Sequence, residues 1–156
     1  RLGKNAKPFY LIKFRTMTNE PSVSAKSDEK RITKWGRILR RSSIDELPVI
    51  VNVLKGDMSI VGPRPMPVKY LKRFDSYQLK RLKMKPGITG LAQVSGRNKI
   101  SWERRFNLDV KYIENNSLLT DLNIILRTVF LVIRGDGVTS NQSEIMPEFF
   151  GKKKRK

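Results

Sequence analysis

The chain has 156 residues, and its 33 Lys and Arg against 14 Asp and Glu give a net charge of +19. It contains no Cys and no His, which excludes disulfides, thiolate nucleophiles, Ser-His-Asp triads and metal sites built on Cys or His. Catalysis is left to carboxylates, Lys, Arg, hydroxyl groups or a hard cation. The charge indicates an anionic partner: nucleic acid, an anionic membrane surface or a phosphorylated substrate.

The N-terminal segment predicts a strand over residues 9–17, which are rich in aromatic and β-branched side chains. Alternation along that strand puts Lys13 and Arg15 on one face, about 7 Å apart. This spacing suits the two ends of a diphosphate, and it equally suits the solvated edge of a basic protein. Asp28 is expected to cap the helix that follows. The apolar stripe of that helix comprises Ile32, Trp35, Ile38 and Leu39.

The next helix is predicted from the apolar spacing of Leu47, Ile50, Val51 and Leu54, with Pro48 at its first helical position and Gly56 as its stop. An extended piece follows at residues 58–61, and a further helix is predicted across Val68 to Leu82.

Two helices are predicted at the end of the chain, with Ser101 and Thr120 as their caps. The stretch 118–133 is apolar nearly all round but shorter than the roughly 20 residues of a membrane span. A buried core helix is the favoured interpretation, and a helix at a membrane interface is the alternative. Together the elements predict one α/β or α+β domain.

Asp45 and Glu46 are the first candidates for chemistry, because they are adjacent carboxylates among many arginines. One interpretation is a capping box that starts at Ser43. Pro48 weakens it, since its ring would then clash inside the helix. The other interpretation leaves Asp45 ahead of the helix, ionised beside its arginines and available as a nucleophile towards phosphorus.

Arg64 lies between Pro63 and Pro65, so its guanidinium projects from a stiff loop and matches phosphate oxygens. Gly87, Gly90 and Gly96 with Arg97 are weaker candidates for phosphate contact, because ordinary turns explain them equally well.

Four motifs in order go further than these separate features. They are Lys13–Met17, Leu39–Pro48, Asn52–Pro65 and Lys85–Asn98, and together they resemble the bacterial sugar transferase family, the small monotopic phosphoglycosyl transferases. The resemblance implies transfer of a phospho-sugar from a UDP-sugar to polyprenyl phosphate, with release of UMP. It also implies an α+β fold, small and mostly helical with a few short strands, at the cytoplasmic face of the bacterial inner membrane.

By that resemblance Asp45 is the nucleophile that carries the phospho-sugar, and Glu46, together with Asp45, holds Mg²⁺. Arg40 and Arg64 match family arginines near the phosphates. Phosphate contacts of Lys13, Arg15 and Arg97 follow from charge and position instead.

The expected catalytic domain covers residues 1–137, followed by a polar and then basic tail over residues 138–156. The re-entrant membrane helix of the family would precede Arg1 and is not in this sequence. Val49 and Leu91 replace a frequent Gln and Trp of the family. The alternative function is a basic module that binds nucleic acid or a membrane surface without catalysis. No nucleic-acid motif or series of stacking aromatics supports a nucleic-acid partner.

Overall fold

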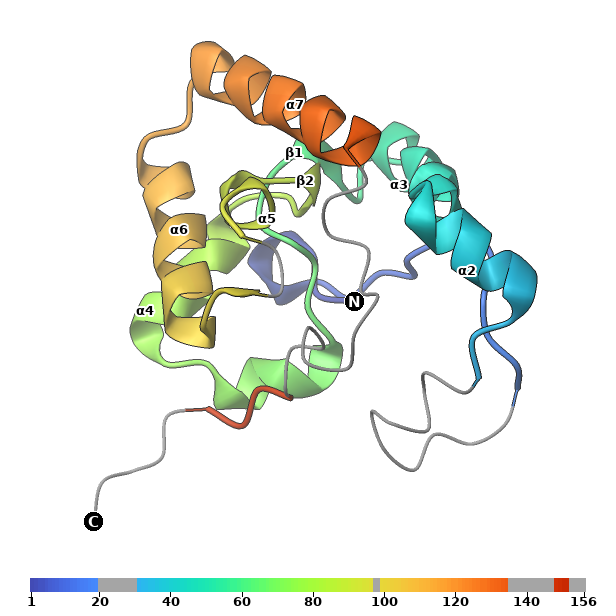
Figure 1. Ribbon diagram of the computed structural model, residues 1–156. Helices are drawn as coiled ribbons and strands as arrows, with labels where there is room; N and C mark the ends of the chain where they lie inside the picture. Colours follow the sequence, from blue (N-terminus) through green and yellow to red (C-terminus); the bar gives the residue numbers. More distant parts are fainter. Residues whose placement is uncertain (20–30, 97–98, 135–147, 152–156) are drawn as a thin grey trace.

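The computed structural model describes residues 1–19, 31–96, 99–134 and 148–151. Short helices dominate this part of the chain, and its sheet consists of two parallel strands, β1 (Ser59–Val61) and β2 (Gly87–Thr89). The predicted α+β domain, mostly helical with a few short strands, is confirmed (Figure 1).

The predicted strand over residues 9–17 is wrong. After the short 3₁₀ helix η1 (Lys4–Ala6) the chain is extended, but it joins no sheet and forms only isolated bridges between Leu2 and Pro8 and between Met17 and Ile32. A side chain takes the place of a neighbouring strand, because the Asn52 amide accepts from the Ile12 N–H and donates to the Tyr10 carbonyl.

The first α-helix, α2 (Lys34–Arg41), starts later than predicted. Thr33 is its cap and accepts a hydrogen bond from the Gly36 N–H at 2.9 Å. Asp28, the predicted cap, lies outside the described residues. Ile32 precedes the helix and forms an isolated β-bridge with Met17. This residue of the predicted apolar stripe therefore lies outside the helix.

The segment after α2 begins in a 3₁₀ helix, η2 (Ile44–Val49), and continues directly as α3 (Ile50–Leu54). Pro48 therefore lies inside η2 rather than at the first position of an α-helix. The stop at Gly56 is confirmed, since Lys55 caps α3 and Gly56 adopts φ +79°, a conformation that favours glycine.

The single helix predicted across residues 68–82 is broken into three pieces. They are η3 (Val68–Arg73), α4 (Ser76–Leu79) and η4 (Lys80–Lys83). The break occurs at Phe74, which is extended, and at Asp75, which forms a capping box with Gln78. The capping box at Asp75 thus separates two helices, although the apolar spacing continues across both of them.

The short helix α5 (Leu91–Val94) follows β2 and leads to the two longer helices of the chain. Ser101 caps α6 (Trp102–Glu114), as predicted. The cap of α7 (Leu118–Ile133) is Ser117, whose side chain accepts from the Thr120 N–H. The prediction of Thr120 as the cap is therefore wrong by one turn.

Two clusters of buried side chains form the core. One cluster joins β1, α5, α6 and α7, and the other gathers aromatic rings around Phe106 of α6. The first consists of Val61, Val94, Tyr112 and Ile124. The second consists of Met66, Tyr70, Phe106 and Phe149.

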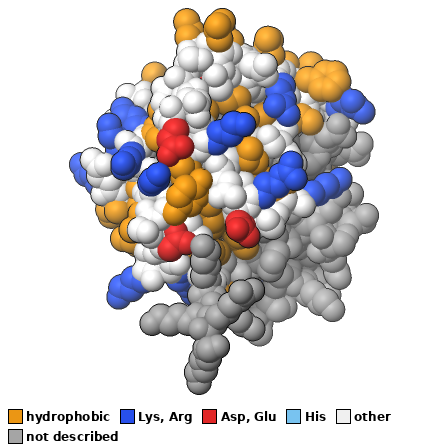
Figure 2. Space-filling model, turned by 90° about the vertical axis from the view of Figure 1, so that its left-hand side faces the viewer, with side chains coloured by type: hydrophobic (Ala, Val, Ile, Leu, Met, Phe, Trp, Pro, Cys, Tyr) orange, Lys and Arg blue, Asp and Glu red, His pale blue; other side chains and the backbone are white. Residues whose placement is uncertain are grey.

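The helix α7 lies over the sheet and α5 at one end of the molecule (Figure 1). The expectation of a buried helix is wrong, because Ile124 is its one buried residue while Leu119 and Ile133 are each 79% exposed. Figure 2 shows hydrophobic side chains gathered along the top of the molecule, where α7 lies in Figure 1. Of the described helices, none combines the length and apolarity needed to cross a membrane.

Candidate active site

The carboxylate pair is placed by a sharp reversal between α2 and η2. Ser43 adopts a left-handed conformation (φ 58°) and its side chain makes no capping bond, so the capping-box interpretation is wrong. The turn folds η2 back against α2. As a result Asp45 is only 5% exposed, while Glu46 remains partly accessible.

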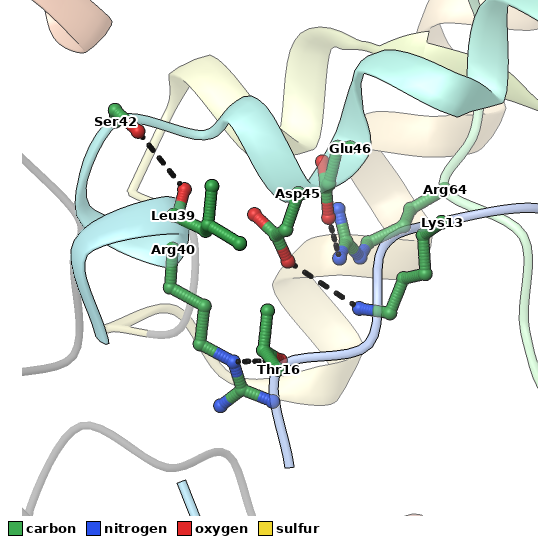
Figure 3. A network of polar contacts seen from close by, with 8 residues as sticks. All are labelled: Lys13, Thr16, Leu39, Arg40, Ser42, Asp45, Glu46 and Arg64. Carbon is green, nitrogen blue, oxygen red and sulfur yellow. Dashed lines mark hydrogen bonds and ion pairs between the residues drawn. The ribbon is translucent and has the colours of Figure 1, made fainter. Parts of the chain in front are cut away.

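The N-terminal segment lies directly beside Asp45. Pro48 has no N–H to offer the Asp45 carbonyl, and the Phe14 N–H binds that oxygen at 3.0 Å. The adjacent side chain, Lys13, brings its Nζ to 3.7 Å from Asp45 Oδ2 (Figure 3). Asn52, which is 1% exposed, holds the preceding residues in place through its two hydrogen bonds.

Arg64 approaches the Asp45–Glu46 pair, called the dyad below, from the proline-rich loop after β1. Its Nη2 donates to Glu46 Oε1 at 3.1 Å (Figure 3). The loop is supported from inside, because Arg81 Nη2 donates to the Arg64 carbonyl at 2.8 Å. The same Arg81 forms a buried ion pair with Asp109 at 2.8 Å.

Arg40 lies on the other side of Asp45, on the last turn of α2. Its Nε donates to Thr16 Oγ1 at 3.0 Å, and Thr16 is 4% exposed (Figure 3). The hydrogen bond fixes the guanidinium close enough to Asp45 to act on its charge.

Burial raises the pKa of Asp45 above its ordinary value. The positive charge of Lys13 opposes this most strongly, Glu46 reinforces it, and Arg40 again opposes it. Burial therefore has a larger effect on the pKa of Asp45 than any single neighbouring charge. A carboxylate with a raised pKa is more basic than an exposed one, which favours nucleophilic attack once it is ionised.

A pocket opens beside the dyad. Its charged lining consists of Arg1, Lys13, Glu46, Arg64 and Arg105. Tyr70 and Trp102 provide an aromatic part of the same wall. Among these lining groups the cations outnumber the one carboxylate, so the pocket suits an anionic ligand.

The dyad also fits the kind of metal site that Mg²⁺ uses with phosphates. In the described part of the chain no three acidic residues cluster as a potential metal site. One or two carboxylates nevertheless suffice for Mg²⁺, because substrate phosphates and water complete its coordination. Glu46, partly accessible and in the pocket lining, is the better placed of the two.

The structure brings together five of the predicted site residues: Lys13, Arg40, Asp45, Glu46 and Arg64. Arg15 is exposed, and among the described residues it belongs neither to the pocket lining nor to the charges that act on Asp45. Arg97 lies outside the described residues.

The sequence analysis does not predict a role in the site for four supporting residues: Asn52, Thr16, Arg81 and Arg105. A signal existed for Asn52, which interrupts the apolar run Ile50–Leu54 with a polar side chain. The two arginines look like any other cation in a chain of this charge, and their burial becomes visible only in the structure.

A buried acid beside a cationic pocket suits a ligand that carries phosphate groups. The family described as "Bacterial sugar transferase" matches residues 1–135. The chain belongs to this family.

Three relatives illustrate the similarity. An uncharacterised sugar transferase, EpsL of Bacillus subtilis, is 48% identical over 153 residues, covering 97% of this chain and 76% of that protein. The undecaprenyl-phosphate galactose phosphotransferase of Salmonella typhimurium is 40% identical over 88% of this chain. The UDP-glucose:undecaprenyl-phosphate glucose-1-phosphate transferase of Klebsiella pneumoniae is 43% identical over 83% of it. The chain spans only 33% and 30% of the last two proteins.

Proposed function

We propose that the chain transfers a phospho-sugar from a UDP-sugar to polyprenyl phosphate, through a covalent intermediate on Asp45. The observation that carries the proposal is a buried carboxylate flanked by Lys13, Arg40 and the Glu46–Arg64 pair, beside a cationic pocket. The names of the Salmonella and Klebsiella relatives support this choice of donor and acceptor.

In the first step a carboxylate oxygen of Asp45 attacks the phosphorus that bears the sugar. The bond from that phosphorus to the bridging oxygen breaks, and its electron pair leaves with UMP. In the second step an oxygen of polyprenyl phosphate attacks the acyl phosphate. The bond between phosphorus and Asp45 then breaks, and the carboxylate is regenerated as polyprenyl-diphospho-sugar departs.

Lys13, Arg40 and Arg64 serve these steps by placing positive charge around the transferring phosphate, which is the main catalytic requirement of phosphoryl transfer. Glu46 holds Arg64 and is the ligand we propose for Mg²⁺. When bound, Mg²⁺ neutralises charge on the diphosphate.

The test is the intact mass of the protein in detergent after incubation with UDP-glucose, UDP-galactose and N-acetylated UDP-sugars in the presence of Mg²⁺. We expect an added phospho-sugar mass with one of these donors, UMP release, and loss of the adduct when polyprenyl phosphate is added. Asp45→Asn should form no adduct. Glu114→Gln, which alters an exposed carboxylate paired with Lys80, is the matched control and should react normally.

Adduct formation by Asp45→Asn, or turnover of wild type without any adduct, would overturn the covalent mechanism. Chelation by EDTA tests the metal: we expect adduct formation to stop and to return with Mg²⁺. Full activity in EDTA would contradict a metal role.

We also propose that α7 contacts an anionic membrane, where the lipid acceptor resides. Leu118, Leu122, Leu126, Val129 and Phe130 are between 48% and 76% exposed on this helix. Such an apolar face gains free energy by entering the headgroup boundary, and the net charge of +19 adds attraction to anionic lipids.

Sedimentation with vesicles tests the membrane contact. We expect binding to vesicles that contain phosphatidylglycerol, weaker binding to pure phosphatidylcholine, and a loss of at least tenfold in Leu126→Glu. Lys111→Glu on α6 changes charge without touching the apolar face and is the control. Unchanged binding of Leu126→Glu would exclude α7 as the contact.

A further inference from the structure

The pocket beside the dyad has a second cationic wall that the sequence-based site does not include. Arg105 and Trp102 of α6 contribute to it, together with Arg1 and Tyr70. None of these four residues belongs to the motifs that place Asp45, Glu46 and Arg64.

Arg105 is an unusual residue for a pocket lining, because its side chain is buried and the positive charges of Arg64 and Arg81 act on it. Its residue is 7% exposed. The pKa of its guanidinium is lowered to about 10, mainly by burial; the charges of Arg64 and Arg81 contribute to the lowering, and Asp109 opposes it. The ring of Trp102 lies 5.3 Å from the guanidinium carbon, which restricts the orientation of the planar group.

Counting charges shows the surplus on this wall. Among the described residues that line the pocket or act on Arg105, the guanidinium groups are those of Arg1, Arg64, Arg81 and Arg105, and the carboxylates are Glu46 and Asp109. Within this described group, four positive charges stand against two negative ones. Asp109 is already held by Arg81, whose Nε and Nη2 both donate to its Oδ2 at 3.1 and 2.8 Å. A bound anion would lower the free energy of such a partly dehydrated positive wall.

Arg64 connects this wall to the dyad. It binds Glu46, and of the neighbouring charges it lowers the pKa of Arg105 and of Arg1 the most. The charges that act on Asp45 are instead Lys13, Glu46 and Arg40. The pocket therefore has two groups of positively charged side chains. One group surrounds Asp45 and Glu46, the other surrounds Arg105, and Arg64 contributes to both.

We infer that Arg105, assisted by Arg1, binds the phosphate of the donor that leaves with the nucleoside. This inference rests on the proposed function, in which a diphosphate is cut between its two phosphates. When the bond to the bridging oxygen breaks, the electron pair stays on that oxygen, so the leaving nucleoside monophosphate gains one negative charge. A fixed guanidinium stabilises this charge as it develops and then holds the product.

The test is UMP affinity, measured by calorimetry on the intact protein, with uridine as the ligand that lacks the phosphate. Because a hydrogen bond to a charged group contributes roughly 1.5–3 kcal/mol, Arg105→Gln should weaken UMP binding about tenfold to a hundredfold. Uridine binding should not change. Arg104→Gln removes the same charge from an exposed neighbouring position and should bind UMP like wild type.

Kinetics give a second readout that a purely structural role would not produce. Arg105→Gln should raise the KM for the UDP-sugar and weaken product inhibition by UMP in parallel. If Arg105→Gln does not fold, Arg105→Lys keeps the charge but loses the planar fork, and it should still bind UMP more weakly than Arg104→Lys does.

UMP affinity within twofold of wild type in a folded Arg105 variant, or an equal loss in the matching Arg104 variant, would overturn the inference. This failure is distinguishable from failure of the proposed function. In the first case wild type forms the adduct and UMP binds without Arg105, whereas in the second no donor yields an adduct although UMP binding can still be measured.

Discussion

Two buried carboxylates in this protein have opposite surroundings. Asp109 is 2% exposed, and two nitrogens of Arg81 bind one of its oxygens within 3.1 Å. Asp45 is 5% exposed, but the cation paired with it, Lys13 Nζ, is 3.7 Å from its Oδ2 and belongs to a side chain that is 39% exposed.

The difference matches a structural role for Asp109 and the nucleophilic role proposed for Asp45. Asp109 is saturated by a rigid guanidinium that also supports the Arg64 loop. Asp45 has given up much of its water without gaining close charged hydrogen bonds of this kind. Burial raises the pKa of both carboxyl groups, so the two acids differ in their charged hydrogen bonds and not in the direction of the pKa shift. Similar burial therefore accompanies a closed ion pair at Asp109, whereas it leaves Asp45 available for the nucleophilic role proposed above.

The largest expected effect is on the reaction catalysed through Asp45. Asp45→Asn should lower turnover by at least about a thousandfold, because removal of a catalytic nucleophile leaves only binding and electrostatic contributions. Its melting temperature should stay the same or rise, since a buried carboxylate with raised pKa stabilises the fold only while protonated and loses this contribution as pH increases through that pKa. A large drop in melting temperature would contradict the comparison.

The same Asp→Asn substitution at Asp109 should instead lower the stability of the fold. Asp109→Asn leaves the Arg81 charge buried without its counter-charge, which costs about 3–5 kcal/mol of unfolding free energy. Urea denaturation followed by fluorescence of the two tryptophans measures this loss. Stability within about 0.5 kcal/mol of wild type would show that the Arg81–Asp109 pair is dispensable.

A smaller effect is expected where Thr16 positions Arg40 beside Asp45. Thr16→Val keeps the shape but removes the acceptor of the Arg40 Nε, which should cost about 1 kcal/mol of stability. The rate of adduct formation should fall as well, because Arg40 loses its fixed position. Thr18→Val, at an exposed position nearby, is the control and should change neither quantity.

The smallest effect concerns Lys13 and is seen in the pH profile. Lys13 lowers the pKa of Asp45 against the effect of burial, so Lys13→Met should move the acid limb of kcat/KM to higher pH. The shift of the limb should be small, because the Lys13 side chain is 39% exposed and solvent screens its effect on Asp45. Lys13→Arg should leave the limb in place, and a shift to lower pH in Lys13→Met would show that Lys13 does not act on Asp45.

The sequence by itself determined which groups are available for chemistry. The absence of His and Cys, the Asp45–Glu46 pair and the stiff loop around Arg64 led to the right family and to residues that lie together in the structure. Local signals also placed the Ser101 cap and the Gly56 stop correctly, because caps and left-handed glycines depend on a few adjacent residues.

Tertiary structure alone decided how those groups are used. The segment 9–17 has the pattern of a strand, but Asn52 from a distant helix satisfies its backbone instead. The apolar pattern of α7 predicts burial, but the sheet and α5 cover one face of the helix and the other remains exposed. Arg81 and Arg105 resemble every other cation in a chain of net charge +19 until folding removes them from water. Burial and pairing depend on residues far apart in the chain, so periodicity and local propensity do not contain them.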